Sequence, residues 1–124
     1  MIPFSVDFKP GIAFYEQLIH ALKKAIISGV FQHGDKIPSI QTLSQELKIN
    51  PNTVQKALTK LVTEKILKVQ PGGYTIENVN IEQYQNLLMW DMEHLILEAK
   101  RLKLSEKDII SAVQKHWKEL SREG

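Results

Sequence analysis

Side chains suited to binding nucleic acid gather on one face of the segment between residues 50 and 64. Asn52, Gln55 and Lys56 recur there at three- and four-residue spacing, so a helix would place them on one side. Amide and ammonium groups form hydrogen bonds with base edges and phosphates. Polar residues on a helix face most often only contact solvent, so the surrounding elements must decide between these two interpretations.

Residues suited to catalysis or to metal binding form no comparable pattern. The chain has no cysteine, which excludes a disulfide scaffold, a thiolate zinc site and a cysteine nucleophile. It contains no HExxH, GxSxG, P-loop or GxGxxG pattern. Asp91, Glu93 and His94 could bind a metal together with His116, but such polar groups usually only contact solvent. We therefore expect no enzyme, no cofactor and no metal.

Length and composition limit the size and the class of the fold. The 124 residues, of which 43% are hydrophobic, suffice for one packed core and a small appendage. The net charge of +2 is too small to indicate nucleic acid by itself. Residues 1–78 carry 9 lysines, no arginine and 6 acidic residues, whereas residues 79–124 carry 7 basic and 8 acidic residues. The two halves therefore differ in charge and are expected to differ in role.

The chain shows neither a secretory leader nor a membrane-spanning segment. No apolar run approaches the roughly 20 residues that a transmembrane helix needs. The first residues, Met1-Ile2-Pro3-Phe4, lack a charged leader and an apolar core. We expect a cytoplasmic protein with no membrane partner.

Two amphipathic helices are predicted in the first forty-odd residues. Apolar positions at three- and four-residue spacing predict a helix over 14–28, which Gly29 ends. A turn and the short extended piece Lys36-Ile37 follow. Ser39 is a favourable N-cap for a second helix, over 39–47, which is short enough to need neighbouring elements for stability.

A third helix and a hairpin complete the first half. Asn50 as N-cap and Pro51 in the first helical position predict a helix over 50–64. Segments 66–70 and 74–77 have strand-like sequences and flank a Pro-Gly-Gly turn, which predicts a β-hairpin. This order predicts a winged helix-turn-helix, whose third helix, about 10 Å wide, fits a DNA major groove of about 12 Å.

The second half is predicted to be helical and to pair with another copy of the chain. Asn80 is the expected N-cap of a long helix over 80–102, and Ser105 with Asp108 resembles a capping box that starts a last helix. Two helices have few ways to bury their apolar stripes, which include Met89, Met92, Ile110 and Leu120. The candidate dimerisation residues are Leu87, Leu88, Trp90, Leu95, Leu102, Ile109, Val113 and Trp117.

The fold class is thus mainly α with a small β-hairpin wing, in two domains. Residues 1–78 form the winged helix-turn-helix domain and residues 79–124 a helical dimerisation domain. An effector pocket between protomers, lined by Trp90 and Trp117, is an alternative use of the two tryptophans, although aromatic residues at helical spacing more often lie in a core or an interface.

Five blocks of sequence in the first half carry a family resemblance. They are Tyr15-Glu16-Gln17-Leu18, Ala25-Ile26-Ile27-Ser28-Gly29, Gly34-Asp35-Lys36-Ile37-Pro38-Ser39, Asn50-Pro51-Asn52-Thr53-Val54 and Ala57-Leu58. In this order they resemble the DNA-binding domain of GntR-family bacterial transcription regulators. Residues 99–110 resemble the short two-helix C-terminal domain of the YtrA subfamily. The resemblance implies a homodimeric repressor, in a subfamily whose members often control operons for ABC-type membrane transporters, without the effector-binding domains of larger subfamilies.

Departures from the family pattern carry predictions of their own. Gln41, Pro51 and Gln55 stand where the family frequently has arginine, so the DNA-binding half has no guanidinium group. Since arginine is the commonest partner of guanine and Asn or Gln suit adenine, we expect contacted bases that lean toward A·T, with guanine contacts by Lys56 still open. Lys48 and Lys65 replace usual glycines, and we predict left-handed backbone at both, at a cost of about 1 kcal/mol each.

Roles follow for the residues that the resemblance and the helix pattern single out. We assign Asn52 and Gln55 to base edges. The residues assigned to phosphates or groove walls are Ser39, Thr42, Thr53, Lys36, Lys56 and Lys60. The hairpin tip lets backbone approach the minor groove but lacks the basic residue that many wings carry. Tyr15 is expected to pack, and Lys68 to contact either phosphate or solvent. The candidate DNA-binding residues are Lys36, Ser39, Gln41, Thr42, Asn50, Asn52, Thr53, Gln55, Lys56, Lys60, Lys68, Gly72 and Gly73.

The sequence therefore predicts a dimeric regulator of transcription, most simply a repressor bound to an inverted-repeat operator in double-stranded DNA. A small-molecule effector is allowed but not identified. The alternative is a winged-helix module that binds a protein partner and has lost DNA binding, which the missing arginines and the low net charge favour.

Overall fold

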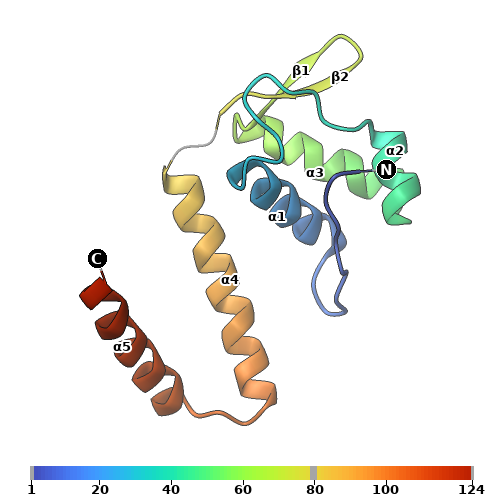
Figure 1. Cartoon of the computed structure of the whole chain (residues 1–124). Coiled ribbons are helices and arrows are strands. Elements are labelled where there is room, and N and C mark those ends of the chain that lie inside the picture. Colours follow the sequence, from blue (N-terminus) through green and yellow to red (C-terminus); the bar gives the residue numbers. More distant parts are fainter. Residues whose placement is uncertain (1, 79–80, 124) are drawn as a thin grey trace. The chain divides into compact units, whose positions relative to one another are not determined.

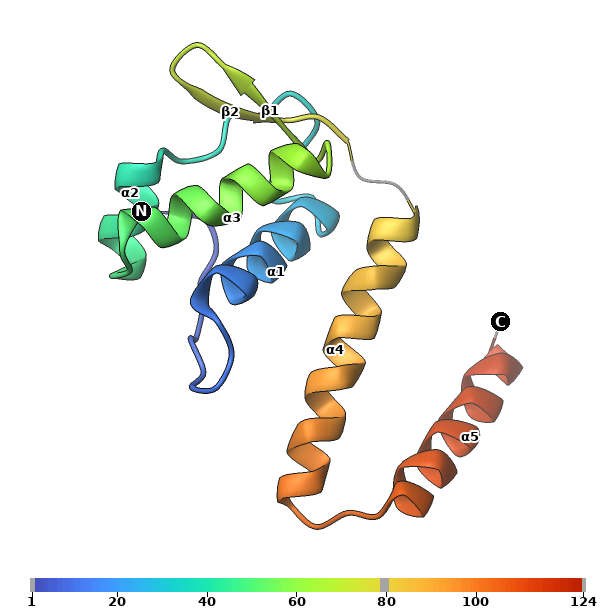
Figure 2. The same cartoon turned by 180° about the vertical axis from the view of Figure 1, so that it is seen from behind.

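The computed structural model describes residues 2–78 and 81–123 of the chain (Figure 1; Figure 2). The predicted fold class is confirmed, because three helices and an antiparallel hairpin are followed by two further helices. The elements are α1 (Phe14–Ile27), α2 (Ile40–Leu47), α3 (Pro51–Thr63), β1 (Leu67–Gln70), β2 (Gly73–Ile76), α4 (Ile81–Arg101) and α5 (Glu106–Glu123).

Side-chain caps fix where the two central helices begin. The Ser39 hydroxyl accepts a hydrogen bond of 3.1 Å from the backbone N–H of Thr42. The Asn50 side-chain oxygen accepts one of 2.7 Å from the N–H of Asn52, with Pro51 in the first turn. Both predicted caps are confirmed, and each satisfies an N–H group that the helix itself leaves without a partner.

A lysine with left-handed backbone follows each of α2, α3 and α4. Lys48 and Lys65 have φ angles of 57° and 62°, so the prediction of left-handed backbone at both is confirmed. Lys103, after α4, has a φ of 63°, which the sequence pattern did not predict. Three lysines thus occupy a conformation that glycine adopts at less cost, and each turns the chain sharply after a helix.

The core of the first part of the chain lies between α1, α2, α3 and the hairpin. α1 and α3 pack side by side, and α2 and β1 pack against α3. The fully buried side chains come from every one of these elements or from the loops beside them: Leu18, Leu22, Leu43, Val54, Leu58, Leu61, Ile66 and Leu67. Because α3 contributes more of them than any other helix, its opposite face is held rigidly toward solvent.

The hairpin is a two-stranded antiparallel sheet that a third segment extends. Gln70 pairs with Gly73, so Pro71 and Gly72 form the turn and Gly73 lies in β2 rather than in the turn as predicted. Gly72 has a φ of 84°, which glycine adopts readily. Lys36 pairs with Thr75 as an isolated bridge, which confirms the predicted extended piece before α2.

An N-terminal arm packs onto this core. Ile2, Phe4, Val6 and Phe8 alternate along the arm and lie against the core residues. The buried side chain of Gln17 holds the end of the arm, since its amide donates to the carbonyl of Lys9 at 2.9 Å and accepts from the Lys9 N–H at 2.8 Å. The sequence analysis did not assign this arm to the core.

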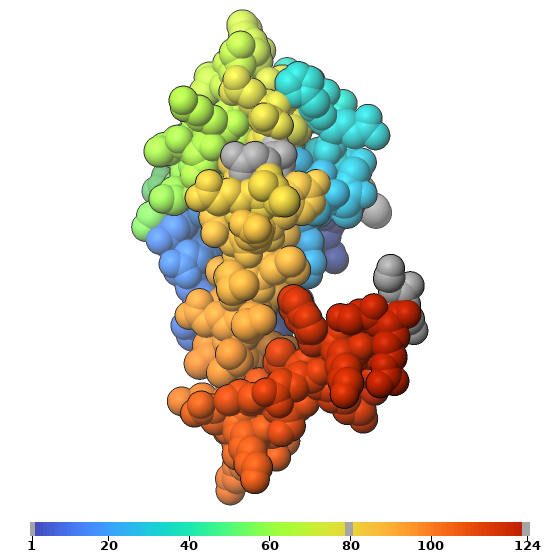
Figure 3. All heavy atoms as spheres, turned by 90° about the vertical axis from the view of Figure 1, so that its left-hand side faces the viewer, coloured from blue at the N-terminus to red at the C-terminus, as the bar shows by residue number. Residues whose placement is uncertain are grey.

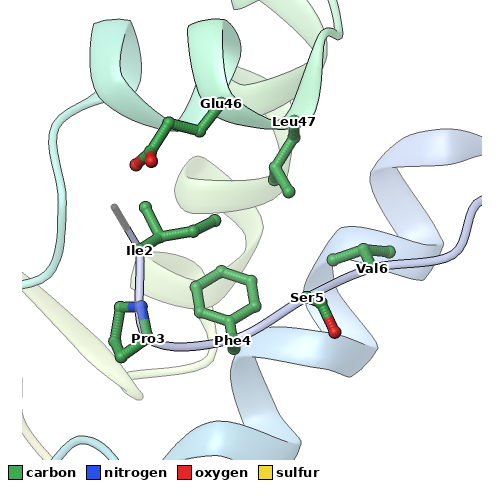
Figure 4. Close-up of a pocket in the computed structure, with 7 residues that line it drawn as sticks. All are labelled: Ile2, Pro3, Phe4, Ser5, Val6, Glu46 and Leu47. Atoms are coloured by element: carbon green, nitrogen blue, oxygen red, sulfur yellow. The ribbon is translucent and has the colours of Figure 1, made fainter.

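Residues of the arm and of α2 line an open pocket of about 550 Å³. Figure 4 shows Ile2, Phe4 and Leu47 on its wall, with the carboxylate of Glu46 at its edge. The lining is about equally polar and apolar, and it comes from the arm and the end of α2 rather than from the polar face of α3.

Contacts divide the chain into two compact units, one up to Leu87 and the other from Leu88 onward. The predicted domain boundary after residue 78 stays a prediction, and the expected N-cap Asn80 lies outside the described residues. The predicted capping box is present: the Ser105 N–H donates to the Asp108 carboxylate at 2.9 Å, and the Asp108 N–H donates to the Ser105 hydroxyl at 3.0 Å. α5 therefore begins where the sequence predicts.

Candidate nucleic-acid interface

The exposed face of α3 carries the side chains predicted to contact bases. Asn52, Gln55, Lys56 and Lys60 are all exposed, whereas Thr53 is half-buried. The buried positions of the same helix are Val54, Ala57, Leu58 and Leu61. A 3.6-residue period thus separates a packed face from a polar one, and the polar face is available to a groove of DNA.

Gln55 is held by two hydroxyl groups. Its side-chain nitrogen, Nε2, donates to Oγ1 of Thr59 on the same helix and to the hydroxyl oxygen of Tyr74 in β2, each at 3.2 Å. The second bond joins the exposed face of α3 to the wing across 19 positions of sequence. The amide predicted to contact a base edge is therefore oriented before any ligand binds.

Lys56 is also oriented by an aromatic ring. Its ammonium nitrogen lies 4.0 Å from the ring centroid of Tyr15 in α1, within the range of a cation–π interaction. The Tyr15 hydroxyl donates to the Glu16 carboxylate at 3.5 Å, and the ring packs against the core, as predicted for a packing residue. Tyr15 thus places a positive charge at the edge of the polar face.

The start of α2, the helix that precedes α3 in the chain, contributes hydroxyl groups. Ser39 caps α2, and its hydroxyl also donates to Oγ1 of Thr42 at 3.0 Å. Gln41 is exposed and Thr42 is half-buried. The N-terminus of a helix is a favourable place for a phosphate, because its free N–H groups and its dipole both attract anions. Asn50, by contrast, uses its side-chain oxygen to cap α3.

The wing has a basic group that does not belong to the hairpin. A Cβ atom added at Gly72 would lie 3.1 Å from Nζ of Lys36, and one added at Gly73 would lie 3.0 Å from its Cε. The Lys36 side chain therefore rests against the hairpin tip, which protrudes from the first unit in Figure 3. Lys36, predicted to contact phosphate, thus supplies the charge that the hairpin tip lacks, and this placement was not predicted from the sequence.

Lys68, the lysine of the hairpin itself, is exposed in β1.

An ion pair fixes the C-terminal end of α3. It joins Lys23 of α1 to Glu64, which follows α3, at an N–O distance of 3.0 Å. The structure thus brings the candidate DNA-binding residues together in the first unit, on α2, α3, the wing and the segment just before α2.

The candidate dimerisation residues lie on α4 and α5, except Leu102, which directly follows α4. Leu87, the last residue of the first unit, is buried, and Trp90 and Ile109 are half-buried. The remaining five are exposed: Leu88, Leu95, Leu102, Val113 and Trp117. Ile110 and Leu120, predicted to face inward, are exposed as well. The apolar stripe is therefore real but is not covered within the described residues of one chain.

The two histidines of the weighed metal site, His94 and His116, have other contacts. The His94 ring stacks on Trp90 with a centroid distance of 3.6 Å, and its Nδ1 lies 2.8 Å from the Trp90 carbonyl oxygen. His116 pairs with Glu119. Across residues 2–78 and 81–123, no group of three or more His, Cys, Asp or Glu side chains could hold a metal ion.

In the same two stretches of chain, no helix has the length and apolar character needed to cross a bilayer.

The chain has three packed helices, of which the third exposes a polar face, followed by a hairpin wing. These features define a winged helix-turn-helix protein. Residues 14–76 match the family described as bacterial regulatory proteins of the gntR family. The chain belongs to the GntR family of bacterial transcription regulators. This family and the relatives are regulators of transcription and not enzymes, as the sequence predicted.

Individual relatives extend the likeness over most of the chain. The chain is 31% identical over 99 residues to the HTH-type transcriptional repressor YtrA of Bacillus subtilis (strain 168), which covers 76% of each chain. YtrA from Sulfolobus acidocaldarius, a GntR-family transcription factor, has a TM-score of 0.56 at 28% identity and covers 94% of this chain and 98% of its own. These two likenesses support the YtrA subfamily.

A third likeness is to a structure that contains DNA. The DNA-binding domain of AraR in complex with operator ORX1 has a TM-score of 0.51 at 27% identity and covers 58% of this chain and 94% of its own. A relative of the first unit therefore binds an operator.

Proposed function

We propose that this chain is a dimeric repressor that binds an inverted-repeat operator through α3 and the wing. The observation that carries the proposal is the joint placement of an exposed amide-bearing face on α3 and a lysine-bearing hairpin tip in one rigid unit. In this arrangement α3 enters the major groove and the wing approaches the backbone of the flanking minor groove.

The dimer is supported by the apolar stripe on α4 and α5. Trp117 is 75% exposed, Leu102 73% and Leu88 63%, which is unusual for large apolar side chains on one stripe. Pairing with a second copy buries the same surface on both chains, which is the usual arrangement of a two-fold symmetric dimer. Two copies of α3 would then face half-sites about one helical turn, roughly 34–36 Å, apart.

The contacted bases are expected to lean toward A·T. Arginine is absent from residues 1–78, and the exposed face of α3 offers Asn52 and Gln55 instead. Amide side chains match the edge of adenine, whereas the bidentate partner of guanine is arginine. Base substitution in the footprinted operator tests this point, and contacts confined to G·C pairs would contradict it.

The regulated genes and the signal belong to the same proposal. Resemblance to the YtrA subfamily supports an operon for an ABC-type transporter as the target, and action in the cytoplasm, where such an operon is transcribed. An effector would act by binding one arrangement of the dimer better than another, because only differential affinity shifts an equilibrium.

Fluorescence anisotropy of the full chain with its own upstream promoter duplex and with a scrambled duplex, at two salt concentrations, tests the proposed function. We expect two chains per promoter duplex, an affinity well above that for the scramble, and a steep loss of affinity at the higher salt concentration. Equally weak binding to both duplexes would contradict the repressor and favour the module that binds a protein partner.

A further inference from the structure

We propose that Tyr74 is a specificity-determining residue, which orients the Gln55 amide so that only its oxygen faces the DNA bases. The inference rests on the proposed function, because it concerns how the same face of α3 selects its operator. Tyr74 itself need not touch a base, so its role is to position Gln55.

The hydrogen bonds of Gln55 account for the orientation. An amide nitrogen has two hydrogens, and those of Gln55 go to Thr59 Oγ1 and to the Tyr74 hydroxyl oxygen, each at 3.2 Å. Among the described residues, no group donates a hydrogen bond to Oε1 of Gln55. With both N–H groups engaged, the side chain presents an acceptor to a ligand.

An acceptor at this position selects among the bases. In the major groove, adenine N6 and cytosine N4 carry hydrogens, whereas guanine O6 and N7 and thymine O4 are acceptors. Gln55 Oε1 therefore favours adenine or cytosine on the contacted strand and opposes guanine and thymine. At this one position the inference adds cytosine to the adenine expected from residue type alone.

Tyr74 is held firmly enough to impose this orientation. Tyr74 pairs with Val69 across the hairpin. On its other side, the Tyr74 carbonyl oxygen accepts a hydrogen bond of 3.0 Å from the N–H of Ile37. Its ring is half-buried and packs against the core. The backbone and the ring are thus fixed by contacts that do not involve the hydroxyl, so Tyr74→Phe removes the bond to Gln55 alone.

Selection from a pool of random DNA duplexes tests the inference, using the full chain as wild type, Tyr74→Phe and Gln55→Ala. The position whose base preference disappears in Gln55→Ala is the one that Gln55 contacts. There we expect adenine or cytosine with the wild type, and a rise of guanine and thymine of about threefold to tenfold with Tyr74→Phe. That factor is what one neutral hydrogen bond typically contributes. The other positions keep their preferences.

Tyr84→Phe is the matched control. It also removes a tyrosine hydroxyl, but from an exposed side chain on α4 that is not among the candidate DNA-binding residues. We expect the wild-type base preference from this variant.

Three results would overturn the inference. The first is a wild-type preference for guanine or thymine at the Gln55 position, which the reversed amide would give, because each hydroxyl can donate as well as accept. The second is a Tyr74→Phe preference identical to that of the wild type. The third is a uniform loss of affinity across all positions together with a lowered melting temperature, which would mean that Tyr74 is only structural. A failure of the proposed function is separate and looks different, because the wild type itself would then enrich no sequence.

Discussion

The two units of this chain differ in where their apolar side chains lie. The first unit buries its large apolar residues between three helices and a hairpin and turns polar groups outward on α3. The second unit exposes leucines, methionines and a tryptophan along α4 and α5. Burial of apolar surface is the main favourable term in folding, so the first unit is stable through its own contacts, whereas the exposed stripe of the second unit supports the proposed dimer.

The proposed DNA contacts and the proposed dimer contacts therefore belong to different units. Because the first unit is complete, its exposed side chains can be oriented in advance, as the tyrosine contacts of Gln55 and Lys56 show. Because the proposed dimer covers the second unit, we expect the stability of that unit to depend on protein concentration. Changes made in the two units should therefore have different consequences.

The largest expected effect is a loss of stability from the core of the first unit. Leu58 is fully buried, so Leu58→Ala should lower the free energy of unfolding by about 2–5 kcal/mol through lost burial and a residual cavity. Urea unfolding followed by circular dichroism measures the change. A loss below about 1 kcal/mol would mean that the core tolerates a cavity and is less complete than described.

The next effect concerns association. Trp117→Glu places a charge on the exposed stripe of α5 and should raise the dissociation constant of the dimer by about 30-fold or more, since buried aromatic residues dominate interfaces. Sedimentation velocity measures it. Ser111→Glu adds the same charge to an exposed position on the opposite side of α5 and should leave the dimer intact. If both variants raise the dissociation constant equally, the stripe is not part of the dimer interface.

A smaller effect is expected from the charge at the wing. Lys36→Ala should weaken binding to the promoter and to the scramble by a similar factor, and should reduce the salt dependence by about one phosphate contact. Anisotropy titrations at several salt concentrations measure both. Lys107→Ala, in the exposed first turn of α5, carries the same charge change and should have no such effect. A Lys36→Ala effect confined to one sequence would contradict a backbone contact.

The smallest effect is a pH dependence at the start of α5. The Ser105 N–H and then the Ser105 hydroxyl hold the pKa of the Asp108 carboxyl below its ordinary value of 3.8. A lowered native pKa means that the ionised carboxylate stabilises the fold above the unfolded value, and that this contribution is lost as the pH falls from there through the native value. The helical circular dichroism of wild type should fall in that range more than that of Asp108→Asn. Identical acid transitions would exclude the cap as their cause.

Features set by neighbouring residues could be predicted from the sequence. Ser39 and Asn50 cap helices through bonds that span two or three residues. The left-handed backbone of Lys48 and Lys65 was predicted from the family resemblance, because both stand where glycine is usual. Such local geometry is encoded in residue type and spacing. For the same reason the helix order, and with it the fold class, could be predicted.

Features that join distant residues could not be predicted in this way. The bond from Gln55 to Tyr74 spans 19 positions, and the contact of Lys36 with Gly72 at the hairpin tip spans 36. Helical or strand periodicity contains no information about such pairs. The N-terminal arm was missed because its alternating apolar residues, such as Phe4, are too few to distinguish a packed segment from a loop.

Chemical-shift mapping of the backbone amides with the promoter duplex is the most direct test of the difference between the two units. For the ¹⁵N-labelled full chain, we predict that the large shifts cluster at the start of α2, on the exposed face of α3 and at the hairpin tip. A scrambled duplex should produce smaller shift changes at the same places, but the amides of Asn52 and Gln55 should not shift with it. Large shifts centred on α4 and α5, or none with either duplex, would contradict the account.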